Sequence, residues 1–301
     1  MGYRNVFLVS DAKITVKNDQ LVLAADCKRT IPLEDLNAVV VDNLQTVFSS
    51  YALSELAKYG VTVIFTDKSH LPNAVLQPLG SYCRQLQVLK CQIDTSVVTY
   101  KQIWKRITSQ KIINQALALK YAGIDEWESV YRLAAMVKSG DSDNIEAIAA
   151  QKYFTLMFGK GFRRGSDCLI NSQLNYGYAI LRSAIAKQLC VCGFEPCLGI
   201  FHHNELNNFN LADDLIEPFR PVVDLFVKHN TADRDDDDEL TPNDKAQLVN
   251  LLNVDVIYSG KEYAVSYAIE IMVNKLALCL KNSSADIILP EIILLKNHCY
   301  E

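Results

Sequence analysis

The sequence predicts an α+β protein in which an N-terminal antiparallel β domain, residues 1–85, precedes a larger all-α domain, residues 95–301. In the first segment, apolar residues occur in short β-branched or alternating runs, as is typical of strands. From about residue 95 they recur with the 3.6-residue period of a helix. Half of the 301 residues are hydrophobic, so the chain can bury a sizeable core and is not disordered throughout.

The β domain is expected to contain one short helix among its strands. Turn residues at 10–11 and 18–19 separate the first strands. Residues 49–59 have helical spacing and end before Gly60, a residue suited to the left-handed position that closes a helix. Residues 86–94 are expected to form a linker. The expected strands are 6–9, 12–16, 21–23, 38–41 and 61–65.

The all-α domain has one helix with a clear start and an acidic run just before it. Thr241 suits the N-cap, Pro242 the first helical position, and Asp244 completes a capping box. The acidic run 233–239 is most simply a solvated loop, because it lacks the glycine and the terminal glutamate of a calcium-binding loop. The expected helices are 97–120, 126–138, 142–157, 172–192, 211–228, 243–253 and 259–281.

Composition excludes several classes of protein. No apolar run reaches the about 18 residues of a membrane-spanning helix, and no signal-peptide core opens the chain, which predicts a cytoplasmic protein. Nine scattered cysteines indicate reduced, mostly buried thiols.

The net charge of −5 argues against avid nonspecific binding to nucleic acid. The run 233–239 carries all of this charge, however, so the rest of the chain can present a basic face. Phosphate-binding, dinucleotide-binding and nucleophile-elbow motifs are absent.

Two glutamates occur within predicted helices that are otherwise rich in apolar residues. Glu146 begins a helix face that apolar residues continue, so its carboxylate can point inward, although an exposed helix acid is the simpler interpretation of that segment alone. Glu217 lies between apolar residues, where an unpaired carboxylate is costly. Pro218 predicts a kink or break beside it.

The segment 199–221 is the densest in polar side chains. It contains His202 and, before Glu217, Asn210 as an expected N-cap with Asp213 and Asp214 in the first helical turn, where carboxylates offset the helix dipole. A histidine with two half-buried carboxylates is one way to hold a divalent ion.

A cluster of cations follows the Glu146 helix. Lys160, Arg163 and Arg164 alternate with aromatic residues and glycines over 158–165. Arginine side chains bind phosphate well, so these residues are candidates for DNA contacts, although the cluster is equally consistent with a solvated helix end.

At these residues the sequence resembles a known family. It is similar, nearly end to end, to the CRISPR-associated adaptation integrases, the first of the numbered Cas proteins, and most to the form found in type II systems. The longest and most specific match joins Gly199-Ile200-Phe201-His202 to Asp214-Leu215-Ile216-Glu217-Pro218-Phe219-Arg220-Pro221. The other matching segments are 31–36, 60–63, 146–159 and 170–178.

The resemblance implies a metal site and a reaction. It gives the metal-ligand and catalytic positions to Glu146, His202 and Glu217, with Mg²⁺ or Mn²⁺ as the ion. Spacing alone does not decide between His202 and His203, but the family's Gly-x-x-His pattern selects the former. The implied reaction is attack of a fragment's 3′-hydroxyl, or of water, on a DNA phosphodiester. Arg182 and Arg220 are weaker candidates for DNA contacts than the cations of 158–165.

The resemblance also implies partners. A homodimer joined through the β domains is expected, and two such dimers are expected to flank a small ferredoxin-like Cas partner in a heterohexamer. A type II effector nuclease is a further expected partner. Two alternatives stay open: a stand-alone nuclease that acts on branched DNA, and a noncatalytic DNA-binding scaffold in which the acids are helix caps.

Overall fold

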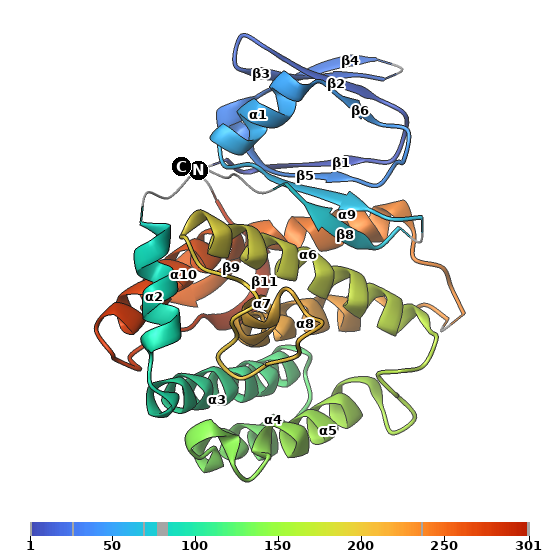
Figure 1. Cartoon of the computed structure of the whole chain (residues 1–301). Coiled ribbons are helices and arrows are strands. Elements are labelled where there is room, and N and C mark those ends of the chain that lie inside the picture. The colour runs from blue at the N-terminus through green and yellow to red at the C-terminus, as the bar shows by residue number, and fades with distance from the viewer. Residues whose placement is uncertain (1, 26, 69, 77–83, 236, 300–301) are drawn as a thin grey trace.

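The computed structural model describes residues 2–25, 27–68, 70–76, 84–235 and 237–299. A strand-rich N-terminal region precedes a helical region, which confirms the predicted order; the first lies above the second in Figure 1. Residues 77–83 of the predicted β domain lie outside the described residues, as does one aspartate of the acidic run. No helix in the described part of the chain is both long and apolar enough to cross a membrane.

Among its described residues, the N-terminal region contains two four-stranded sheets and one α-helix. Helix α1 (Ser50–Lys58) starts and ends as predicted, because the Ser49 side chain accepts a hydrogen bond from the backbone of Ala52 and Gly60 adopts a positive φ of 71°. The first sheet has the order β1 (Arg4–Leu8), β5 (Leu36–Val41), β7 (Thr62–Thr66), β8 (Pro72–Val75). The second has the order β4 (Lys28–Pro32), β3 (Gln20–Ala24), β2 (Lys13–Lys17), β6 (Val47–Phe48).

The expectation of an antiparallel β domain is wrong for several strand pairs. β1 pairs with β5, β5 with β7, and β2 with β6, all in parallel, whereas the hairpins β2–β3 and β3–β4 and the pair β7–β8 are antiparallel. Parallel strands need a crossover connection, and β2–β4 and α1 provide the connections before β5 and β7. Alternating apolar residues indicate a strand but not the direction of its neighbour.

The first sheet separates two hydrophobic cores. Alternate residues of β5 and β7 point to opposite faces, as strand geometry requires. Ala38, Val40 and Ile64 belong to the core of the helical region, whereas Val39 and Val63 belong to the core between the sheets. Helix α6 lies along the helical side of this sheet and contacts β7 and β8 (Figure 1).

Helix α3 is the centre of the helical region and contacts α4, α5, α8 and β11. The 23-residue helix α6 lies above α3 in Figure 1 and contacts α7, α8, α9 and α10. The capping box predicted at Thr241 and Asp244 is confirmed. The helices here are α2 (Gln85–Asp94), α3 (Val97–Tyr121), α4 (Trp127–Tyr131), α5 (Ile145–Phe158), α6 (Leu169–Val191), α7 (Asn210–Leu215), α8 (Arg220–Asn230), α9 (Pro242–Asn250) and α10 (Val265–Lys281).

The expected linker 86–94 is wrong as a description of that segment, because it forms helix α2. Val88 and Gln92, four residues apart, are buried on one face of α2, and the helix contacts α10. The pairing of these distant helices stabilises a segment whose own sequence gives little helical signal. The division into domains at 1–85 and 95–301 stays a prediction.

The helical region is not all-α, which corrects the second part of the predicted fold class. Strands β9 (Val254–Tyr258), β10 (Lys261–Ala264) and β11 (Glu291–Asn297) form an antiparallel sheet in the order β10-β9-β11. The helix expected at 259–281 therefore begins only at Val265. Ser259 and Gly260 have positive φ angles of 53° and 77° and form the turn between β9 and β10.

Candidate active site

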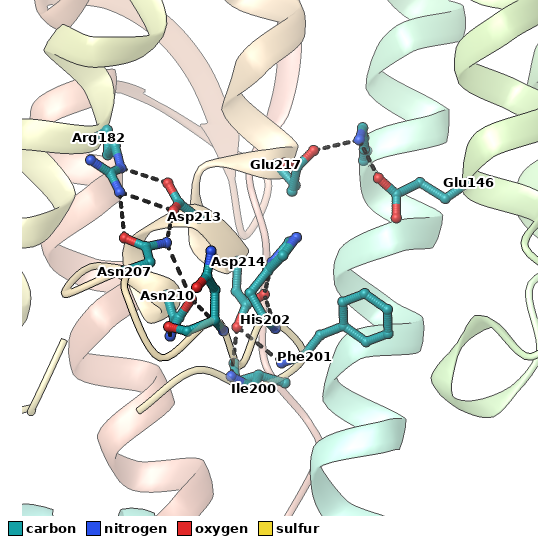
Figure 2. Close-up of polar contacts among 12 residues, drawn as sticks. Glu146, Arg182, Ile200, Phe201, His202, Asn207, Asn210, Asp213, Asp214 and Glu217 are labelled. Carbon is teal, nitrogen blue, oxygen red and sulfur yellow. Dashed lines mark hydrogen bonds and ion pairs between the residues drawn. The ribbon is translucent and has the colours of Figure 1, made fainter. Parts of the chain in front are cut away.

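Glu146 and Glu217 meet at a single buried cation. The Nζ atom of Lys111, on α3, lies 2.5 Å from Oε1 of Glu146 and 2.5 Å from Oε2 of Glu217. Figure 2 shows the two carboxylates pointing toward each other from opposite sides. The structure thus brings together two of the three residues predicted to form the metal site, although they lie far apart in the sequence.

Local structure explains how each glutamate reaches this position. The carboxylate of Asp141 accepts hydrogen bonds from the backbone amides of Ile145 and Glu146, which sets the start of α5. The helix break predicted from Pro218 is confirmed, because α7 ends at Leu215 and a 3₁₀ turn, Glu217–Phe219, precedes α8. Asn114 of α3 donates to the carbonyl of Pro218 at 2.7 Å and fixes this turn against the helix that carries Lys111.

The charges around Glu217 keep it ionised. Its side chain is 7% exposed, and its Oε1 accepts a hydrogen bond from Arg220 Nε at 2.8 Å. Burial raises the pKa of Glu217, but the charges of Arg220 and Lys111 outweigh burial and lower that pKa to about 2. For Lys111, burial lowers the pKa, and the two glutamates outweigh it and raise the pKa above its usual value.

His202 is positioned by Asp214, whose role differs from the one expected. Instead of offsetting the helix dipole, the fully buried Asp214 accepts hydrogen bonds from the backbone amides of Ile200, Phe201 and His202. Its Oδ1 also lies 2.6 Å from Nδ1 of His202 (Figure 2). This hydrogen bond raises the pKa of His202, against burial, which lowers it. A carboxylate on Nδ1 leaves Nε2 as the ring nitrogen available to a ligand.

A second polar network holds the loop that follows His202. Arg182 of α6 donates to both carboxylate oxygens of Asp213, at 2.6 and 3.0 Å, and to Asn207 at 2.9 Å (Figure 2). Asn210 is not the N-cap that the sequence suggested, because Phe209 occupies that position. The Asn210 side chain instead donates to the backbone carbonyls of Cys197 and Asn204 and so stabilises the loop.

The residues fit a divalent cation in their chemistry. An ammonium group already bridges the two carboxylates, and the buried Oε2 of Glu217 has no donor aligned for a hydrogen bond. However, in the described part of the chain no three His, Cys, Asp or Glu side chains are arranged to hold one metal ion. An ion between the glutamates would need Lys111 Nζ to move, so the ligand roles of Glu146, His202 and Glu217 stay predictions.

The five cations predicted to contact DNA fall into two groups. Lys160 and Arg163 are exposed, and neither side chain has an ion pair or hydrogen bond among the described residues. Arg164 donates to Asn171 at 2.5 Å and to Asn175 at 3.0 Å. Arg182 and Arg220 are held by carboxylates inside the site. The exposed pair is therefore the better placed for phosphate contacts, which stay a prediction for all five residues.

A buried acid that the sequence analysis did not single out links the helices around the site. Asp224 of α8 accepts hydrogen bonds from the hydroxyls of Tyr153 on α5, at 2.9 Å, and of Tyr178 on α6. The Arg220 guanidinium lies 4.5 Å from the centre of the Tyr178 ring. Burial raises the pKa of Asp224 to about 6, although both tyrosine hydroxyls lower it.

This raised pKa predicts a pH-dependent difference in stability between the wild type and Asp224→Asn. The folded protein binds the Asp224 proton more tightly than the unfolded chain, whose aspartate pKa is near 3.8. The contribution of this tighter proton binding to the free energy of unfolding is therefore complete below pH 4 and is lost as the pH rises through 6. We expect the free energy of unfolding of the wild type, relative to the variant, to fall by about 3 kcal/mol between pH 4 and 8. Urea unfolding of both proteins at several pH values measures this difference. A constant difference between wild type and variant at every pH would contradict the prediction.

Lys111 is the site residue that the sequence analysis missed. The signal was present, because Lys111 follows Trp104 and Ile107 on the buried face of α3. A lysine on such a face is rarely buried without an acidic partner. The pattern therefore indicates a buried ion pair, but it does not identify the partner.

Comparisons with known proteins identify the family of this chain. Residues 6–240 match the family model for CRISPR associated protein Cas1. The chain is 38% identical over 304 residues to the CRISPR-associated endonuclease Cas1 of Neisseria meningitidis serogroup C (strain 8013), with both chains covered completely. Its fold is similar to that of a casposase bound to integration product, with a TM-score of 0.76, 22% identity, and 94% and 92% of the two chains covered. A Cas6-RT-Cas1–Cas2 complex has a similar chain, with a TM-score of 0.69, 20% identity, and 94% and 35% covered. The chain therefore belongs to the CRISPR-associated Cas1 family.

Proposed function

We propose that this chain is a metal-dependent DNA integrase and endonuclease of CRISPR adaptation, which inserts short DNA fragments into a repeat array. The observation that carries the proposal is the meeting of Glu146 and Glu217 at one buried cation. The full-length likeness to a CRISPR-associated endonuclease supports the same class of activity.

In the proposed mechanism the chain's own residues bind and orient. Glu146, Glu217 and the Nε2 atom of His202 would hold a Mg²⁺ or Mn²⁺ ion, and the chemistry that such an ion would supply is polarisation of the scissile phosphate. Asp214 fixes the imidazole through Nδ1, and Arg220 keeps Glu217 ionised.

The attacking group decides the product. When the 3′-hydroxyl oxygen of a fragment bonds to the repeat phosphorus, the phosphodiester bond of the repeat strand breaks, and its former 3′ oxygen leaves as a hydroxyl. The fragment is then joined to the repeat. When water attacks, the same bond breaks and the product is a nick.

The proposal includes partners. A homodimer joined through the β domains, with two dimers flanking a small ferredoxin-like Cas partner in a heterohexamer, would place two such sites on one DNA. The similarity to a chain in a Cas6-RT-Cas1–Cas2 complex supports a Cas partner. Cooperation with a type II effector nuclease, in the cytoplasm, completes the proposal.

A strand-joining assay tests the proposed activity. Purified protein, with and without the small Cas partner, is incubated with a labelled fragment, a repeat-bearing plasmid and Mg²⁺ or Mn²⁺. Joined product that disappears with EDTA supports an integrase. Nicking without joining would favour the stand-alone nuclease on branched DNA, and metal-independent binding without either product would favour the scaffold.

The exposed cations after α5 predict the salt dependence of DNA binding. Replacing Lys160 and Arg163 by glutamine should weaken binding to every DNA sequence and reduce the slope of log K against log salt by about 2, one for each lost phosphate contact. Replacement of Arg132, which is exposed but paired with Glu128, is the matched control and should leave the slope unchanged. Equal slopes for wild type and double variant, measured by fluorescence anisotropy, would remove both residues from the DNA-binding surface.

A further inference from the structure

Two cations already neutralise the two glutamates of the site. Lys111 contacts both carboxylates, and Arg220 contacts the second oxygen of Glu217. The charges of Glu146, Glu217, Lys111 and Arg220 therefore balance. A divalent cation that approaches these four side chains meets no net attraction from them, unlike a site with two uncompensated carboxylates.

The Lys111 ammonium also occupies the space in which a cation can contact both glutamates. It lies at 2.5 Å from an oxygen of each, so an ion that bridges the same two atoms cannot bind while it stays. The other oxygen of Glu217 is engaged by Arg220. A metal ion that bridges these two oxygens thus has to displace Lys111 Nζ.

The geometry allows this displacement on one side of the site. The Glu146 side chain is 25% exposed, whereas those of Lys111 and Glu217 are 10% and 7% exposed, so solvent reaches the cluster past Glu146. Lysine carries a compact charge on a flexible four-carbon stem, and its ammonium can move to a new anion without a movement of α3. A DNA phosphate bound at this opening would supply such an anion.

We infer that Lys111 is a built-in competitor for the metal position, so that the site binds a divalent cation tightly only when a DNA phosphate attracts the lysine ammonium away from the glutamates. The inference rests on the proposed function, because it assigns the metal to Glu146 and Glu217. It makes metal binding and DNA binding cooperative: each favours the arrangement that the other needs.

A purely structural role for Lys111 predicts the opposite effect of its removal. If the ammonium served to orient the two glutamates for the metal, its loss would weaken metal binding, as the loss of other supporting contacts does. If it competes, its loss strengthens metal binding. The sign of the change in affinity decides between these roles.

The test is the affinity for Mn²⁺, measured by the electron paramagnetic resonance signal of the free ion, for wild type and Lys111→Met without DNA. We expect the variant to bind at least about tenfold more tightly, because one buried positive charge beside the ion is gone. Lys101→Met removes an exposed lysine of the same helix and is the matched control, with unchanged affinity expected. In EDTA, Lys111→Met should have a lower melting temperature than the wild type. Mn²⁺ should raise the melting temperature of Lys111→Met by more than it raises that of the wild type.

A second measurement on the wild type does not depend on how well the variant folds. Addition of a short DNA duplex should tighten the binding of Mn²⁺ to the wild type by about tenfold or more. The DNA itself binds some Mn²⁺, and that amount is measured in a matched mixture of the duplex with Glu217→Gln and subtracted. Equal or weaker binding by Lys111→Met, or no effect of DNA on the wild type, would overturn the role of Lys111 while wild-type Mn²⁺ binding leaves the proposed function standing. If neither protein bound Mn²⁺ with or without DNA, the metal site itself, and the proposed function with it, would be refuted.

Discussion

We expect Glu217→Gln to lower the rates of strand joining and nicking by at least about a thousandfold in the plasmid assay, because the proposed site would lose the charged ligand that holds the metal against the scissile phosphate. The substitution keeps the shape of the side chain and removes its charge. Arg220 then loses its carboxylate, and Lys111 keeps only Glu146. A buried cation left unpaired is costly, so the free energy of unfolding should also fall, by about 3 kcal/mol or more.

The control for this variant is Glu128→Gln, an exposed glutamate of α4 outside the site, which should keep wild-type rates and stability. Circular dichroism before the assay separates lost activity from unfolding. Should Glu217→Gln retain full activity, the acids are structural and the noncatalytic scaffold becomes the better interpretation.

Asp214→Ala is expected to have the largest effect on stability among the single substitutions in the site. It removes an acceptor of three backbone amides and of the His202 imidazole, all in a fully buried position. Buried donors without a partner cost about 1–3 kcal/mol each, so the free energy of unfolding should fall by at least about 4 kcal/mol. In protein that remains folded, strand joining should slow by about 10–100-fold, because the imidazole loses its orientation.

The neighbouring Asp213→Ala serves as the comparison. Asp213 contacts the side chains of Arg182 and Asn207 and is more exposed than Asp214, so its replacement should cost less stability. Urea unfolding of both variants tests the order. Equal losses of stability would mean that the hydrogen bonds to Asp214 do not set the structure of the His202 loop.

Features of the fold and of the site that depend on neighbouring residues were predictable from the sequence. Pro218 cannot continue an α-helix, so a break beside Glu217 follows from one residue. Thr241 and Asp244 satisfy each other's backbone amides, so the start of α9 follows from four residues. Both predictions are confirmed, since the atoms that decide them are close in the chain.

Features that depend on distant residues were not predictable in the same way. Lys111 meets its two acids only after α3, α5 and the turn at Glu217 have packed together. Asp214 has the spacing of a first-turn acid, but the fold places the backbone of Ile200 against it. Likewise, the alternation in β1 and β5 indicates strands without revealing that they run in parallel. In each example the role of the residue or strand depends on where its partner lies in the fold. A local sequence pattern carries no information about that position.

A crystal structure of the protein with Mn²⁺ and a short DNA duplex, with the ion located by its anomalous scattering, tests the central claim most directly. We expect one peak at about 2.1 Å from a carboxylate oxygen of Glu146 and of Glu217, with His202 Nε2 as a third ligand and Lys111 Nζ turned toward a phosphate. Lys111 still bridging both glutamates in the DNA complex, with no anomalous peak between them, would contradict the account.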